Sequence, residues 1–392
     1  MLGLNDFRLR KPCLVSIILT AMPHSMRREN KRANDLENDQ SYVLRLPLEL
    51  LLAISDYLSP TDGACFALSC PILLKALGLQ RWPSLNPGKK RDETEIELFL
   101  KTLTRDLPHR FFCHSCNRLH PRGRLRAPGP LFRRREEHLQ CLGDYGTALP
   151  CSFGNPNHSF YSFSFKHLQL VMEKYHYGFD HGIPAESLSF TEVSVPTDGI
   201  HETGDGVARL LSVEARICPR PVGLYLRVQH WLFVNTTNHD EILAQSDGMW
   251  LCDHIPDFTL SFRRSVEHIL ATSSGETLKC TLCNMDYEIR LRDFPGEGSA
   301  LVITKWLDLG AGLTPYDPRW RAHVSYPRMG VRAFLSNAGD VQARFESEYQ
   351  PEGRGQTQEA LTDLNAWYLS RKRFKKVMHP WTCGTWVLQG EQ

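Results

Sequence analysis

The stretch LLSVEARICPRPVGLYLRVQHWLFV, residues 210–234, decides the fold class of the larger part of this chain. Apolar residues at every second position up to Ile217 predict a strand with one buried face. The sequence PRPVG at 219–223 has the composition of a turn. Residues 207–234 are therefore predicted to form a β-hairpin. The apolar positions that carry this pattern are Leu211, Val213, Ala215, Ile217, Leu224, Leu226, Val228, Leu232 and Val234.

Other segments beyond residue 110 add strands and one helix. ALVITKWLDLG predicts a buried strand over 300–307, and residues 166–175 predict a helix. After Cys283, apolar residues alternate with charged ones from Asp286 onward, which is typical of a half-buried strand. We therefore expect residues 111–390 to form a mixed α+β domain.

Length and composition describe an ordinary globular chain. It has 392 residues, 42% of them hydrophobic and 23% charged, which suits two or three domains. The net charge of +2 gives no overall field that would attract nucleic acid. No apolar run is long enough to span a bilayer, and no fixed repeat period is present.

The N-terminal residues 1–42 are predicted to be an extension without stable structure. A basic flank and a short apolar run over residues 8–21 resemble a signal peptide. The alternative is a mis-assigned start, with Met22 or Met26 in place of Met1 as the first residue.

Residues 46–79 form a leucine-rich segment whose only charged residues are Glu49, Asp56, Asp62 and Lys75. Pro47 suits a first helical turn, the sequence SPTD at 59–62 can cap a second helix, and Pro71 begins a third. A segment this short cannot enclose its apolar surface alone, so a protein contact is predicted. Packing into the core of the main domain is the alternative.

The segment LPLELLLAISDYLSPTDGACFALSCPILLKALG, residues 46–78, together with Trp82, resembles an F-box. That resemblance implies a three-helix module over 43–82 that binds the adaptor subunit of an SCF-type ubiquitin ligase, and through it the cullin and RING proteins. Residues 83–110 then form a linker and a connecting helix over 94–107. The resemblance places these residues at the adaptor contact: Leu46, Pro47, Glu49, Leu50, Leu51, Ile54, Leu58 and Leu68.

Twelve cysteines include two C-x2-C pairs, Cys113/Cys116 and Cys280/Cys283. Two thiolates on such a turn can bind one tetrahedral metal ion. Thioredoxin-like chemistry needs a βαβ context that neither pair has, and disulfides need an oxidising compartment, which an F-box argues against. Two structural zinc ions are therefore predicted.

The remaining zinc ligands are predicted from neighbouring residues. Cys141 and Cys151 would complete a four-thiolate first site, with His120 as a rival for one position. Cys252 and His254 would join Cys280 and Cys283 in a zinc-ribbon-like second site. A hydrogen-bonded core histidine is the alternative role for His254.

No catalytic signature occurs in the chain. The H-E-x-x-H, G-x-S-x-G, Walker A, G-x-G-x-x-G and zinc-deaminase patterns are all missing from the sequence. No catalytic residue is therefore predicted, and the chain is not expected to be an enzyme.

The segments CHSCNRLH, WLCDHI, CTLC and LTPYDPRWRAH, with the hairpin, resemble in this order uncharacterised filamentous-fungal F-box proteins. The resemblance implies a substrate-receptor subunit of the ligase, in the cytoplasm or nucleus, with an unidentified protein target. The alternatives are a zinc-binding protein that acts in transcription or binds nucleic acid, and an F-box protein that acts outside the ligase.

Two local motifs each have two interpretations. RKRFKK at 371–376 fits a nuclear-localisation or nucleic-acid patch, or a solvated helix end. Residues 317–320 fit a binding spot or a packed Trp320 with an Asp–Arg bracket.

Overall fold

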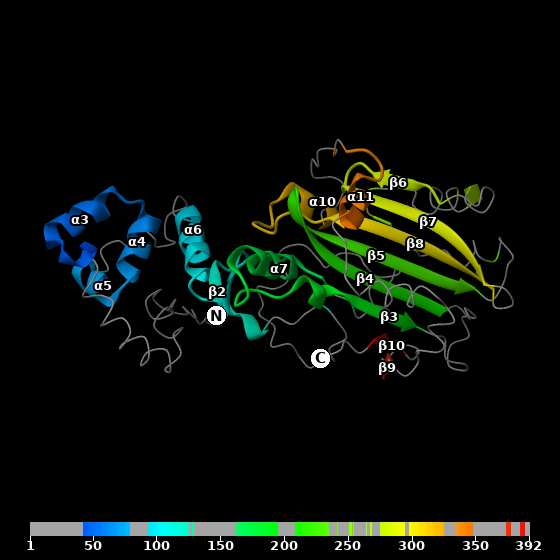
Figure 1. Ribbon diagram of the computed structural model, residues 1–392, viewed down its shortest axis with the longest axis horizontal. Helices are drawn as coiled ribbons and strands as arrows, with labels where there is room; N and C mark the ends of the chain where they lie inside the picture. Colours follow the sequence, from blue (N-terminus) through cyan, green and yellow to red (C-terminus); the bar gives the residue numbers. More distant parts are fainter. Residues whose placement is uncertain are drawn as a thin grey trace, which may run out of the picture. The chain divides into compact units, whose positions relative to one another are not determined.

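The chain divides into two compact units, Met1–Leu103 and Thr104–Gln392. Within the described ranges, no helix combines the length and the apolar content that crossing a membrane would need. The computed structural model, drawn in Figure 1, describes residues 42–78, 93–124, 128, 161, 163–194, 208–234, 241, 251–252, 254, 264, 267–268, 275–294, 298–324, 334, 336–347, 374–377 and 385–388.

Short helices make up the first unit, and the prolines of the sequence set their starts. Ser59 Oγ accepts a hydrogen bond from the backbone N–H of Asp62 at 3.1 Å, which caps the second of these helices as predicted. The helix expected over 94–107 ends earlier, at Thr104, where a turn bonds the N–H of Leu107 to the carbonyl of Thr104. The elements are η1 (Tyr42–Arg45), α3 (Leu48–Tyr57), α4 (Pro60–Leu68), α5 (Pro71–Leu77) and α6 (Glu93–Thr104).

A small apolar core joins α3, α4 and α5. Leu51, Ala67, Leu73 and Leu77 are buried in it, and Leu46 is among the partly buried residues packed against them. Because one helix cannot turn every side to so small a core, the other side chains of α3 lie outside it.

An antiparallel sheet forms the centre of the second unit (Figure 1). Its order is β6-β7-β8-β5-β4-β3-β10-β9, and every neighbouring pair runs antiparallel. A separate two-stranded ribbon pairs β1 (Arg110–Cys113) with β2 (Arg118–Pro121). The strands of the large sheet are β3 (Phe190–Ser194), β4 (Ala208–Pro219), β5 (Val222–Val234), β6 (Thr277–Cys280), β7 (Met285–Phe294), β8 (Gly298–Asp308), β9 (Phe374–Val377) and β10 (Thr385–Leu388).

The predicted hairpin is confirmed as β4 and β5. Their pairing runs from Ala208↔Phe233 to Pro219↔Val222, so that Arg220 and Pro221, joined by a cis peptide bond, form the loop. The strand expected over 300–307 is confirmed within β8, and the helix expected over 166–175 within α7 (Phe165–Tyr177).

The expectation of a half-buried strand after Cys283 is wrong for the first half of β7. Asp286 and Glu288 are buried as fully as the apolar residues between them. Part of the cost of their burial is offset, because Asp286 Oδ2 accepts backbone hydrogen bonds from α11 (Asp340–Ser347) and Glu288 forms an ion pair with Arg290. Sequence alternation identified the strand but could not show that α11 covers its polar face.

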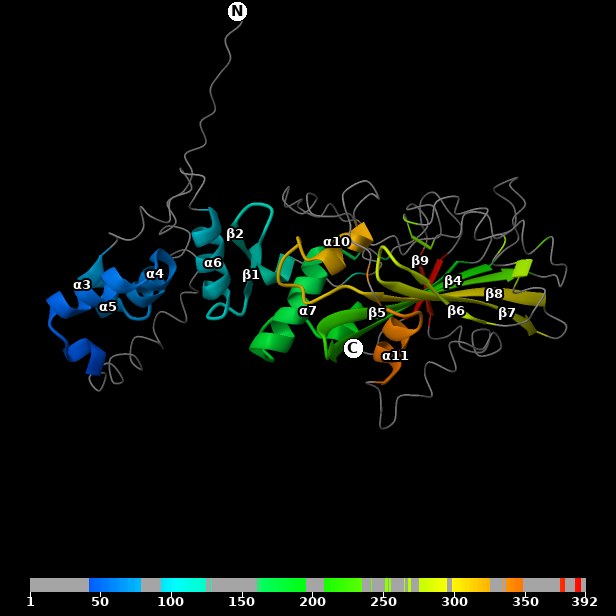
Figure 2. The same ribbon diagram turned by 90° about the horizontal axis from the view of Figure 1, so that it is seen from above.

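Helices pack on both faces of the sheet (Figure 2). α7 and α10 (Pro318–Val324) contribute Leu168 and Trp320 to the main core on one face. α11 lies on the other face, where Val341 and Phe345 pack with Tyr225, Trp306 and Cys218. Two 3-10 turns, η3 (Arg122–Arg124) and η5 (Ala185–Leu188), complete the described elements.

Two features that the sequence left open are decided by the fold. Trp320 is buried, and the Arg319 guanidinium lies 3.4 Å from Asp308 and 3.8 Å from Asp317, so residues 317–320 form a packed tryptophan with an Asp–Arg bracket. Residues 374–377 form strand β9, so a helix end at this part of RKRFKK is wrong. Residues 371–373 lie outside the described part of the chain.

Candidate metal centres and exposed apolar surface

Both C-x2-C pairs lie on the same kind of hairpin. In each, the first cysteine ends one strand and pairs across the hairpin with the residue five positions later, as Cys113↔Arg118 and Cys280↔Met285. The residue after each second cysteine is an asparagine with positive φ, 49° at Asn117 and 46° at Asn284. Asparagine tolerates this left-handed conformation better than most residues. The motif C-x2-C-N was the sequence signal for this shared turn, and sequence reasoning missed the asparagine.

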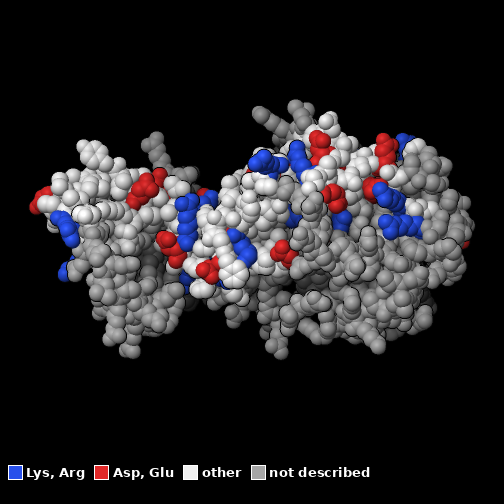
Figure 3. All heavy atoms as spheres, viewed as in Figure 1, with Lys and Arg blue, Asp and Glu red and all other residues white. Residues whose placement is uncertain are grey.

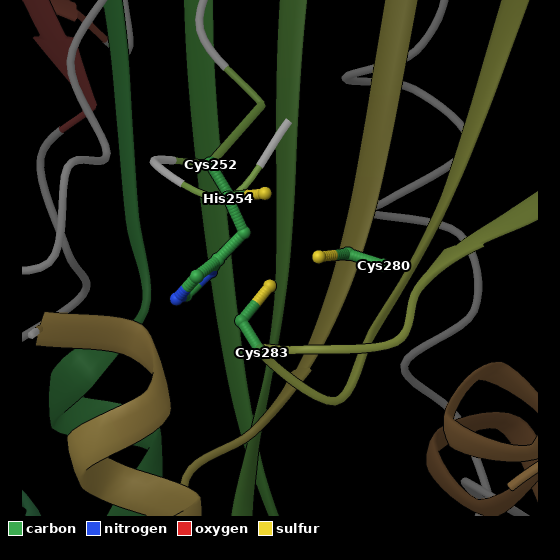
Figure 4. A group of neighbouring side chains, drawn as sticks. All are labelled: Cys252, His254, Cys280 and Cys283. Carbon is green, nitrogen blue, oxygen red and sulfur yellow. The ribbon is translucent and has the colours of Figure 1, made fainter. Parts of the chain in front are cut away.

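The buried centre consists of Cys252, His254, Cys280 and Cys283. Their ligand atoms all lie within 4.8 Å of one another, and each residue is buried. Figure 4 shows the three sulfur atoms converging on one space, with the His254 side chain beside them. The sequence prediction that Cys252 and His254 join the second C-x2-C pair is confirmed as a spatial grouping.

Among the described residues, His254 finds no hydrogen-bond partner for either ring nitrogen, although it is only 8% exposed. This contradicts the alternative of a hydrogen-bonded core histidine. A buried polar atom without a partner costs roughly 1–3 kcal/mol, so such atoms in a native protein need an explanation. A metal ion between the histidine and the sulfurs would supply the missing partner.

When no cation is bound, interactions among the three thiols of the buried centre favour the ionisation of one of them. Hydrogen bonds from Cys252 and Cys283 lower the pKa of Cys280 to about 2. The hydrogen bond to Cys280 is the main cause that raises the pKa of Cys252 to about 12. Hydrogen bonds with Cys252 and then Cys280 are the main causes that raise the pKa of Cys283 well above its usual value. Like charges this close disfavour further ionisation, which a bound divalent cation would reverse.

The ribbon centre consists of Cys113, Cys116 and His120. Their ligand atoms also lie within 4.8 Å of one another, and Cys116 Sγ is 3.0 Å from His120 Nε2. Hydrogen bonds from Cys116 and, to a lesser degree, His120 lower the pKa of Cys113 to about 2. Cys141 and Cys151, predicted as the other ligands here, lie outside the described residues. The rival ligand, His120, is the one that the structure places beside the two thiols.

The ribbon centre packs on α7. Phe111, Cys113 and Leu170 are buried together, with Cys116 packed against them. The Gln169 side-chain amide donates a hydrogen bond to the carbonyl of Phe112 at 2.9 Å. Arg122, after the ribbon, donates to the carbonyl of Asp180 at 2.7 Å. The metal-ligand candidates therefore lie at the junction of the ribbon and this helix.

Cysteine and histidine are the only residue types in the two clusters. Zinc takes this donor set in structural sites, and the three thiols and one imidazole of the buried centre match a Cys3His site. Both clusters therefore have the chemistry of metal binding.

The residues expected at an adaptor contact differ in how far their side chains are exposed to solvent. Pro47, Glu49, Leu50 and Ile54 are exposed, whereas Leu46, Leu58 and Leu68 are partly buried. Leu51 is 4% exposed and belongs to the core of the first unit, so its side chain supports α3 from within.

A scan against protein-family models, a search of curated proteins and a search of solved structures found no match for this chain.

Proposed function

We propose that this chain is a non-catalytic substrate receptor of an SCF-type ubiquitin ligase. The first unit binds the adaptor, and through it the cullin and RING proteins, while the second unit binds a protein target. The observation that carries the proposal is an apolar surface in the first unit. It is formed by Leu48, Leu50, Leu52, Ile54 and Ile72, which are 37–50% exposed.

The side chains of this apolar surface are exposed to solvent. Packing into a core, the alternative role for residues 46–79, would bury these side chains, and exposed apolar side chains on both flanks of one short helix are surface that a protein partner can cover. Few charged side chains interrupt the white surface of the α3–α5 region in Figure 3. Tyr57, at the end of α3, is 93% exposed and extends the set. An adaptor with a complementary apolar groove fits this surface.

The second unit needs no active site in this role. A receptor accelerates ubiquitin transfer by holding the target near the charged conjugating enzyme, which raises the effective concentration of the reactants. Zinc in the buried centre would brace β6 and β7 against the segment at Cys252 and His254. The proposed metal is therefore a scaffold for a target-binding surface, in a protein of the cytoplasm or nucleus.

Adaptor binding by the full chain tests the proposal. Leu50→Ala combined with Ile54→Ala should weaken co-purification with the adaptor–cullin complex roughly thirtyfold, since truncated interface anchors typically cost about 2 kcal/mol. The matched control is Leu98→Ala, because Leu98 on α6 is 52% exposed but lies outside the surface. These positions are better probes than Leu46, which packs on the core. Unchanged adaptor binding by the double variant, or no binding by the wild type, would refute the receptor role.

A further inference from the structure

We propose that the ribbon centre is an exchangeable metal site for a zinc-like ion, with His120 as its third protein ligand. The inference concerns the second unit alone and holds whether or not the first unit binds an adaptor.

Strand register places His120 at this site. His120 pairs with Phe111, two residues before Cys113, and directly paired residues of antiparallel strands share a face. Phe111 and Cys113 also share that face, because side chains alternate along a strand. The histidine is therefore held on the side of the ribbon where the first thiol lies.

The hairpin of the buried centre has the same arrangement. Tyr287 lies four residues after Cys283, as His120 lies four residues after Cys116, and it pairs with Leu278, two residues before Cys280. Tyr287 is buried in the same core cluster as Cys252, Cys280 and Cys283. This position of the hairpin thus faces the sulfur atoms in both cases. Only in the ribbon does it carry a metal-binding side chain.

Distances within the trio suit a common ion. For bonds of about 2.3 Å to sulfur and 2.0 Å to nitrogen, a tetrahedral ion holds S and N roughly 3.5 Å apart. The observed separation of Cys116 Sγ and His120 Nε2 is 3.0 Å, so a shift of about half an ångström suffices. Binding would release the remaining thiol protons to solvent, because the thiolate is the ligand. The fourth tetrahedral position is left to a ligand outside the trio.

The two centres differ in how deeply their ligand candidates are buried. Every ligand candidate of the buried centre is at most 9% exposed, whereas Cys116 and His120 are partly exposed and only Cys113 is fully buried. An incoming chelator or competing ligand can therefore reach the ribbon centre directly, but reaches the buried centre only after local opening. The ribbon site should exchange its metal faster than the other.

Metal content and chelator kinetics of the full chain test the inference. Wild-type protein purified without added metal should carry two ions and lose one to a chelator well before the other. His120→Ala should lose the fast-exchanging ion. The metal affinity of this site should fall by more than roughly 10–100-fold, which is the usual cost of losing a residue that only supports a ligand. His120→Cys should restore the ion. The matched control is His109→Ala, because His109 is an exposed histidine just before the ribbon.

Cobalt substitution keeps the test decisive if His120→Ala does not fold. The two clusters contribute five cysteines to the thiolate-to-cobalt absorption expected of wild-type protein, and His120→Cys should increase this absorption by adding a sixth. Hydrogen exchange over residues 165–183 adds a further readout, since loss of the ion should loosen the hydrogen bonds from Gln169 to Phe112 and from Arg122 to Asp180. Three results would overturn the proposal. They are two ions retained in His120→Ala, simultaneous loss of both ions from the wild type, and unchanged cobalt absorption in His120→Cys.

Discussion

Asn117 and Asn284 occupy equivalent left-handed turn positions but differ in what their side chains contact. The Asn284 amide donates to Asp308 at 3.1 Å, and its oxygen accepts from Ser336 at 3.1 Å, in a buried environment. Asn117 is exposed in its turn. The backbone requirement is therefore shared, whereas the polar network belongs to Asn284 alone.

This difference gives a prediction for glycine substitutions. Asn117→Gly should be nearly neutral, because glycine adopts positive φ freely, while Asn117→Ala should cost on the order of 1 kcal/mol. Asn284→Gly should cost roughly 1–3 kcal/mol, because it removes the side-chain hydrogen bonds that Asn284 makes with Asp308 and Ser336. Urea unfolding of the metal-loaded protein measures all three. Equal costs for the two glycine variants would contradict the distinction.

Glu173 on α7 makes stability depend on pH. Burial raises its pKa to about 7 from 4.5, while a hydrogen bond from Gln169 opposes the rise. The folded state therefore holds this proton more tightly than the unfolded state, and stability falls as pH rises from 4.5 through 7. Glu173→Gln keeps the carbonyl acceptor for Gln169 but removes the charge.

Glu173→Gln should accordingly stabilise the protein above pH 7 by at most about 3 kcal/mol, and by less to the extent that water screens this partly exposed group. Below pH 4.5 the variant and the wild type should unfold alike. Chemical unfolding at pH 4.5 and pH 8 checks the sign. A variant that is less stable than the wild type at alkaline pH would show that the carboxylate is stabilising.

α11 is held at both ends by side chains of the sheet. At its start, Asp286 Oδ2 accepts the backbone N–H groups of Val341 at 2.7 Å and Gln342 at 3.0 Å. At its end, Glu346 accepts from Arg227 at 3.2 Å, and the Arg216 guanidinium lies 4.3 Å above the Phe345 ring. A carboxylate at the helix start satisfies donors that have no partner within the helix and complements the helix dipole.

Removing the cap should detach this helix. Asp286→Ala is expected to destabilise the protein by about 2 kcal/mol or more, because the first turn of α11 loses a buried charged acceptor. Asp340→Ala is the comparison, since Asp340 accepts only the exposed N–H of Asn337 at 2.7 Å, and it should cost less. Hydrogen exchange at Val341 and Gln342 locates the effect. Protection unchanged in Asp286→Ala would show that packing alone holds α11.

Because the chain forms two compact units, we expect metal loss from the second unit to leave the first unit folded. Structural zinc contributes on the order of 10–16 kcal/mol in small zinc domains, so its removal should unfold its surroundings. Cys280→Ser should drop the zinc content by one ion and open the segment around β6 and β7. The helices α3–α5, whose core holds no residue of either metal centre, should keep their hydrogen-exchange protection and, under the proposed receptor role, the ability to bind the adaptor. Zinc content near zero, with Cys280 and Cys283 joined in a reducible disulfide, would refute the zinc scaffold.

The sequence by itself determined the local elements. Alternation identified β4 and β5, and the apolar stretch ALVITKWLDLG identified β8 as a buried strand. Prolines and a serine cap placed the ends of α3, α4 and α5, and paired cysteines identified the two turns that carry them. These features depend on neighbouring residues along the chain, such as side-chain direction in a strand and the missing N–H of proline, so they are readable without tertiary contacts.

Only the tertiary structure decided which distant residues meet. Cys252 and His254 were candidates for the second cysteine pair in the sequence, but the fold is what brings them within reach of it. Nothing in the sequence showed that α11 lies over Asp286, so that a strand alternating in polarity is buried on both faces. Leu51 points into the small core, whereas Leu50 beside it faces outward, although both are leucines in one apolar run. Periodicity cannot separate such neighbours because burial depends on the packing partner, which the fold alone supplies.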